Sequence, residues 1–178
     1  MVGMMKKLYD ILSLQFELAD FESKRSDLAF CKVKASQAIS LLTHLRDIHG
    51  YTHLVMLTCV DWLEDKQFQL TYLLHNYATK TDLGILVFID RDHPVMDSLH
   101  HLWKQGRVYQ RELHEMFGID FPGSPGVEEP MILEGWQGPP PMRRDFDTKA
   151  YSDETYSHRP RVQNEPEQHM KEQLYSED

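Results

Sequence analysis

The sequence predicts an α+β fold with two layers, in which helices cover one face of a mainly antiparallel sheet and an extended C-terminal arm follows. Residues 52–90 contain alternating or continuous apolar runs, which are typical of strands. Residues 37–50 and 107–117 instead repeat apolar side chains at the helical period. Prolines gather after residue 118, and this concentration predicts the arm.

The N-terminal region predicts a short helix and two strands. Residues 4–14 carry apolar side chains at helical spacing. The segments FELADFES and DLAFCKVKA indicate two strands, joined by the polar turn SKRSD. The side chains expected on the inner side of the helix are Met4, Leu8, Ile11 and Leu12.

A longer helix and three strands come next. We expect Ser36 to cap the helix QAISLLTHLRDIHG and Gly50 to end it. The strands are expected in THLVMLTCVDWLE, FQLTYLLHNYA and LGILVFID. Because the connections DKQ and TKTD are short and polar, these strands should form an antiparallel meander.

Two helical segments complete the predicted core. The segment RDHPVMDSLHHLWKQGR predicts one or two turns that begin at Pro94 and end before Gly106. Residues 107–117 predict a second helix, which Gly118 ends. The side chains expected to face inward in the first segment are Val95, Leu99 and Leu102 or Trp103.

The predicted organisation has three parts: a core domain at 1–118, a Pro/Gly-rich arm at 119–147 and a polar tail at 148–178. Residues 119–144 hold six of the nine prolines, so regular structure is not expected there. An extended segment of this kind buries little surface alone, and we expect it to lie over a partner.

Composition and charge exclude several functions. The net charge of −9 argues against a nucleic-acid module and against unaided binding to anionic lipid. No apolar run approaches the roughly 20 residues of a membrane helix, and the first 20 residues lack a signal-peptide pattern. The sequence therefore predicts a soluble, cytoplasmic chain.

Cysteine and histidine usage predicts no cofactor bound by this chain. Cys31 and Cys59 are far apart, no CxxC is present, and both are expected to be reduced core residues. His114 and Glu115 lack the second histidine of H-E-x-x-H. A stand-alone metal-dependent enzyme, and acid/base catalysis by Glu112 with Arg111, remain as weaker alternatives.

The helix at 107–117 combines an apolar arc with charged groups. At about 100° per residue, Glu112 falls inside the arc, Arg111 and Glu115 lie at its border, and Gln110 and His114 point away. A carboxylate inside an apolar arc needs a cation, for which the candidates are Arg143, Arg144 or an arginine of another chain. The alternative is an exposed Arg111–Glu115 pair with Glu112 at the edge. The arc consists of Val108, Tyr109, Leu113, Met116 and Phe117.

Two segments, YQRELHEMFGIDFPGSP and MILEGWQGPPPMRRDF, resemble the signature of the 30-kDa subunit of respiratory complex I. Related subunits occur in energy-converting membrane-bound hydrogenases and formate hydrogenlyases. The family carries an E-R-E-x-x-D-M-F-G motif, then F-x-G-H-P, then W-x-G-H-P-L-R-K-D. In this chain the motif positions are occupied by Arg111, Glu112, Glu115 in place of the family's Asp, Phe117, Gly118, Phe121, Gly123, Pro125, Trp136, Gly138, Pro140, Arg143, Arg144 and Asp145.

The chain departs from this pattern at several positions. Gln110 stands for the leading Glu of the first motif, and Ser124 and Pro139 stand for two histidines. Glu128 and Glu129 occupy a run where the family usually has two arginines. A hydrogenase-type relative that faces a different large subunit would accommodate this reversal of charge.

The resemblance implies a subunit without an active site of its own, which packs on the large catalytic subunit of the 49 kDa type or on a hydrogenase large subunit. Iron–sulfur clusters, with flavin or nickel–iron, would belong to other subunits of the peripheral arm. Quinone reduction and ion translocation would be activities of the whole complex. Trp136, Arg143 and Arg144 are residue types favoured as interface anchors.

Overall fold

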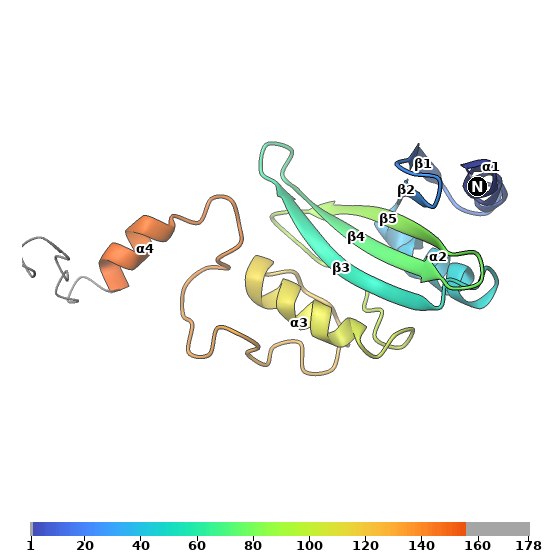
Figure 1. The fold of residues 1–178 in the computed structure, drawn as a ribbon. Coiled ribbons are helices and arrows are strands. Elements are labelled where there is room, and N and C mark those ends of the chain that lie inside the picture. The colour runs from blue at the N-terminus through green and yellow to red at the C-terminus, as the bar shows by residue number, and fades with distance from the viewer. Residues whose placement is uncertain (1, 156–178) are drawn as a thin grey trace, which may run out of the picture. The chain divides into compact units, whose positions relative to one another are not determined.

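The computed structural model describes residues 2–155. A five-stranded sheet with the order β1-β2-β5-β4-β3 forms its centre (Figure 1). Only the β2–β5 pair is parallel within this sheet, which confirms the mainly antiparallel α+β fold. The strands are β1 Leu18–Ser23, β2 Leu28–Val33, β3 His53–Trp62, β4 Gln67–Asn76 and β5 Thr81–Asp90.

The predicted meander of β3, β4 and β5 is confirmed. Both of its pairings are antiparallel, and each connection is short. Alternate residues of β4, from Phe68 to Leu74, are fully buried, whereas the residues between them are half-buried. The helices therefore cover one face of the sheet and leave the other open.

The N-terminal helices have the predicted positions but differ in detail. In α1, Val2–Leu12, Met5 and Leu12 are buried, whereas Met4 and Ile11 are exposed, so the predicted inner side was partly wrong. In α2, Ala35–Asp47, the N-cap is Lys34 rather than Ser36, and no side chain caps the helix.

The segment between β5 and the next helix contains no helix, contrary to the prediction. Asp120 instead pairs with it, since Asp120 N–H donates to the Pro94 carbonyl and Met96 N–H donates to the Asp120 carbonyl. Leu99 and Trp103 are buried as expected, but Val95 is exposed. Pro94 begins an extended contact here rather than a helical turn.

Residues 119–146 contain no helix or strand, yet they belong to the same compact unit as the sheet. Ile119 and Phe121 are completely buried in the core. The expected arm thus folds back over its own domain for much of its length. A second compact unit begins at Asp147 and includes α4, Thr148–Thr155; the rest of the predicted polar tail lies outside the described residues.

Candidate functional site

The helix α3, Gly106–Phe117, carries most of the first motif. Its C-terminal end is in contact with Arg143 of the third motif. Gly118 adopts a left-handed conformation, with φ of 72°, and its N–H donates to the His114 carbonyl. Arg143 Nε donates to the Phe117 carbonyl at 2.7 Å. A cation that binds a terminal carbonyl also complements the negative end of the helix dipole. The two motifs therefore meet at the C-terminus of α3.

Gly118→Ala is expected to destabilise the domain, because the left-handed conformation costs a side-chain-bearing residue about 1–2 kcal/mol. An added Cβ would also lie 3.0 Å from both Arg143 and Pro140. Thermal unfolding measures the effect. The matched control is Gly123→Ala, since Gly123 is equally left-handed but a Cβ there meets nothing within 4 Å. Equal losses in both variants would contradict a role for close packing at Gly118.

Arg111 and Glu115 bind the backbone of the arm instead of each other. Arg111 donates to the carbonyls of Glu129 and Pro130 at 2.9–3.2 Å. The Glu115 carboxylate accepts from the N–H groups of residues 131, 132 and 133 at 2.9–3.3 Å. The alternative of a simple Arg111–Glu115 surface pair is therefore wrong.

Three backbone N–H donors lower the pKa of the Glu115 carboxyl. Partial burial raises the pKa of Glu115, but hydrogen bonds from Met131, Leu133 and Ile132 outweigh it, and the pKa lies below the ordinary value of 4.5. A carboxyl whose pKa is lowered by folding stabilises the fold above its unfolded pKa, and that contribution disappears as the pH falls through the folded pKa.

We therefore expect the amide signals of Met131, Ile132 and Leu133 to titrate together below pH 4.5 in NMR spectra. Above that pH, the arm should stay fully docked at this point. Glu115→Gln provides the control, because it removes the titrating group while it keeps an acceptor oxygen. Amide signals that titrate at or above pH 4.5 would contradict the contact.

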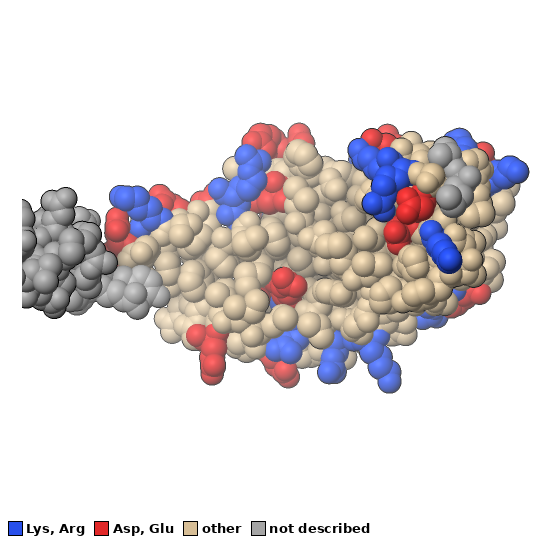
Figure 2. Space-filling view, viewed as in Figure 1, with Lys and Arg blue, Asp and Glu red and all other residues tan. Residues whose placement is uncertain are grey.

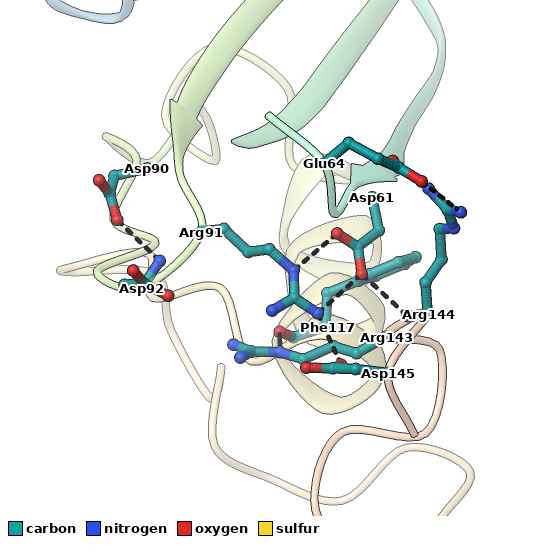
Figure 3. Close-up of polar contacts among 9 residues, drawn as sticks. All are labelled: Asp61, Glu64, Asp90, Arg91, Asp92, Phe117, Arg143, Arg144 and Asp145. Atoms are coloured by element: carbon teal, nitrogen blue, oxygen red, sulfur yellow. Dashed lines mark hydrogen bonds and ion pairs between the residues drawn. The ribbon is translucent and has the colours of Figure 1, made fainter. Parts of the chain in front are cut away.

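A buried ion pair at the end of the sheet joins the third motif, which includes Arg144 and Asp145, to the core (Figure 3). Asp61 in β3 accepts two bonds from Arg91, at 2.7 and 3.1 Å, and both side chains are almost fully buried. Asp61 also accepts from the N–H of Arg144 at 2.9 Å, and Arg91 donates to Asp145 at 2.6 Å. Burial raises the pKa of Asp61, but these donors outweigh it and lower the pKa overall. Neither Asp61 nor Arg91 was among the site residues predicted from the sequence.

The two arginines of the motif have separate contacts within the chain. The Arg144 guanidinium pairs with the exposed Glu64 through two bonds, at 2.6 and 2.9 Å. Arg143 lies over the ring of Phe68, 5.3 Å from its centroid. Neither arginine pairs with Glu112, so the prediction of an internal partner for this carboxylate was wrong.

Glu112 lines a groove between β3 and α3 with a volume of about 400 Å³. Glu112 is half-buried as a residue, and its carboxylate has no ion pair or hydrogen bond among the described residues. The other lining residues are almost all apolar: Met56, Leu57, Thr58, Cys59, Tyr109, Leu113, Met116, Phe117 and Met142.

Gln110 points into the core rather than away from it, contrary to the helical-wheel prediction. Its side-chain oxygen accepts from Ser98 and from Ser124, each at 2.9 Å. Position 110 carries Glu and position 124 carries His in the motifs that the sequence resembles. The two departures from the pattern therefore lie in direct contact with each other in this chain.

The remaining motif residues support the turns of the arm. Phe121 is fully buried, Gly123 is left-handed with φ of 77°, and Pro125 is exposed. Trp136 donates to the Pro139 carbonyl at 3.0 Å, and its ring meets that of Phe146 edge-on.

No set of metal ligands is assembled within residues 2–155, in which no three or more His, Cys, Asp or Glu side chains form a group that could hold an ion. Burial raises the pKa of the Cys31 and Cys59 thiols to about 12, so both thiols stay protonated at neutral pH. In this same part of the chain, every helix is too short or too polar to cross a membrane.

Comparison with known families gives one assignment for most of the chain. Residues 31–152 match the model of the respiratory-chain NADH dehydrogenase 30 Kd subunit. A NuoC-type subunit of the NADH-quinone oxidoreductase of Moorella thermoacetica is 32% identical over 137 residues, which cover 76% of this chain and 92% of that protein. The equivalent protein of Citrifermentans bemidjiense is 30% identical over 128 residues, which cover 71% and 79% of the two chains.

Solved structures show the same fold. A chain of the membrane-bound sulfane sulfur reductase, an archaeal respiratory membrane complex, superposes with a TM-score of 0.79 at 25% identity, covering 89% of this chain and 94% of that one. A trypsin-resistant fragment, residues 1–134, of Nqo5 superposes with a TM-score of 0.58 at 17% identity, covering 70% and 98% of the two chains.

Proposed function

The chain belongs to the family of the 30-kDa subunit of respiratory-chain NADH dehydrogenase, and from this premise we propose that it is a non-catalytic subunit which packs on the large catalytic subunit of the 49 kDa type. It is a subunit of a complex I-like oxidoreductase. The observation that carries the proposal is that the motif residues form contacts among the arm, α3 and the sheet. Within residues 2–155, no three or more His, Cys, Asp or Glu side chains form a group that could hold a metal ion.

Electron carriers would then belong to other subunits, and this chain would contribute a surface on which another subunit packs. Two observations support this assignment of the electron carriers to other subunits. Both cysteine thiols are buried and protonated, and residues 2–155 assemble no set of metal ligands. Attachment to the inner face of the membrane would come through the assembled complex.

A second candidate is the equivalent subunit of another membrane-bound respiratory complex, such as an energy-converting nickel–iron hydrogenase or a formate hydrogenlyase. The superposition on a chain of the sulfane sulfur reductase complex favours it. So do the exposed acidic residues Glu128 and Glu129, which stand where the respiratory family usually carries arginines.

Affinity purification of the tagged chain from detergent-solubilised membranes of its native host tests both candidates. Companions that carry flavin and oxidise NADH support the first candidate, and a nickel-containing large subunit supports the second. The chain purified alone should hold no stoichiometric iron, nickel, zinc or flavin. Substrate turnover by the isolated chain, or its recovery from membranes without companions, would refute the proposal.

A further inference from the structure

The groove that Glu112 lines runs along the free edge of the sheet. β3 is the last strand in the sheet order, so one of its sides has no neighbouring strand. The groove touches four consecutive residues of β3, from Met56 to Cys59. Because strand side chains alternate between faces, contact with consecutive residues exposes the backbone edge itself.

Only the first part of this edge is covered. Trp103 donates to the Thr52 carbonyl, Gln105 to the Leu54 carbonyl and Tyr109 to the Val55 carbonyl. From Met56 to Asp61, the backbone makes no hydrogen bond within the described chain beyond those of the β3–β4 ladder. An unpaired strand edge is a ready template for another strand.

The surface around this edge is apolar. Figure 2 shows the face with β3 and α3 as a broad area with few charged groups, apart from a small isolated acidic spot. Met56 and Met142 line the groove and are exposed by about two fifths or more, and Val60 of β3 and Val108 of α3, which do not line it, are about as exposed as Met56. Exposed apolar residues that line a groove are typical of a protein contact.

Glu112 gives the groove a charge preference. Its carboxylate lies among apolar side chains without a cation from the described chain. The arginines considered as its partners from the sequence, at positions 111, 143 and 144, bind other groups. A half-buried carboxylate in such surroundings favours a partner that supplies a cationic side chain.

We propose that an extended segment of a partner subunit joins the sheet as a sixth strand along Met56–Asp61, with apolar side chains in the groove and a Lys or Arg against Glu112. This mode of recognition combines main-chain pairing for affinity with side-chain pockets for specificity. The proposal rests on the proposed function, since it names the surface through which the chain joins its complex.

A second copy of the chain fits this surface less well than a different subunit does. The free stretch of β3, MLTCVD, contains no Lys or Arg. Two such edges paired together would leave each Glu112 without a cation and would join two chains of net charge −9. The occupant is therefore a segment of another subunit, with alternating apolar residues and at least one basic residue.

Hydrogen–deuterium exchange tests the strand pairing. Those amides between Met56 and Asp61 that point away from β4 should exchange at least about tenfold more slowly in the purified complex than in the isolated chain. The internal control is β4, whose amides should be protected in both states. If the complex is intact and the edge amides exchange equally in both states, the strand proposal fails while the proposed function stands. If the chain is found in no complex, both fail.

Charge reversal tests the cation. Glu112→Lys should lower the fraction of chain in the complex by about tenfold or more, without a change in the melting temperature of the isolated chain. Glu134→Lys is the matched control, because Glu134 is exposed and lies outside the groove. Equal assembly of both variants would overturn the role of Glu112. Concentration-dependent protection of the edge in the isolated chain, with a dimer in sedimentation, would overturn the choice of partner.

Discussion

Arg91→Ala is expected to destabilise the domain by about 3–5 kcal/mol, because it leaves Asp61 buried without its cation. Asp61 has only 2% of its side chain exposed, and two of its three hydrogen bonds come from Arg91. The same change frees Asp145, so the end of the arm should also loosen. Urea unfolding of the purified chain measures the loss.

Arg144→Ala is the matched control for this prediction. Arg144 lies in the same cluster, but its guanidinium pairs with Glu64 on the surface, where solvent screens the interaction. Its N–H bond to Asp61 comes from the backbone and survives the substitution. The structure therefore predicts little change for Arg144→Ala. A loss for Arg91→Ala no greater than that of its control would show that Asp61 is not held by a buried pair.

Phe121→Ala is expected to cost about 3–5 kcal/mol, as large-to-small changes of buried aromatic residues do. Phe121 is fully buried although it belongs to the segment expected to lie on a partner. Its removal should lower the unfolding free energy of the isolated chain. Limited trypsin digestion should then cleave near Arg143 and Arg144 sooner than in the parent chain.

Ile132→Ala separates core packing from surface contact within the same segment. Ile132 is 62% exposed, so its truncation should leave the stability of the isolated chain nearly unchanged. Similar stabilities for the two variants would mean that the arm does not depend on its own domain. Restoration of the Phe121→Ala variant by the complex would indicate that a partner shares this contact.

The regular elements could be predicted because their periodicity is strong. The apolar residues of the meander alternate in β4 and form nearly continuous runs in β3 and β5, and α3 ends at a glycine with positive φ. The helix expected after Pro94 was wrong because a distant residue, Asp120, takes its backbone hydrogen bonds. The tertiary contact with Asp120 outweighs the local helix propensity there, and a short stretch of sequence around Pro94 does not include Asp120.

The sequence identified many residues of the candidate site, but it did not identify the groups that these residues bind. Arg143, Arg144 and Glu115 were identified from a motif, yet each binds within the chain. The helical wheel placed Gln110 away from the apolar arc. The structure buries it with Ser98 and Ser124, which lie before and after the helix and could not be linked to it by spacing alone.

The contact between Asp61 and the segment at 144–145 also sets an order of events during synthesis. The Arg144–Asp61 bond spans 83 residues, and the Arg91–Asp145 bond spans 54. Long loops of this kind close late, since their entropy must be lost before the contact forms. A nascent chain can pair its strands on the ribosome, but it cannot form these two bonds at the end of the sheet until residue 145 has emerged. Completion of this end of the domain is thus tied to the synthesis of residue 145, and a chain that stops before it would keep the Asp61–Arg91 pair but lack the two bonds that residues 144 and 145 add.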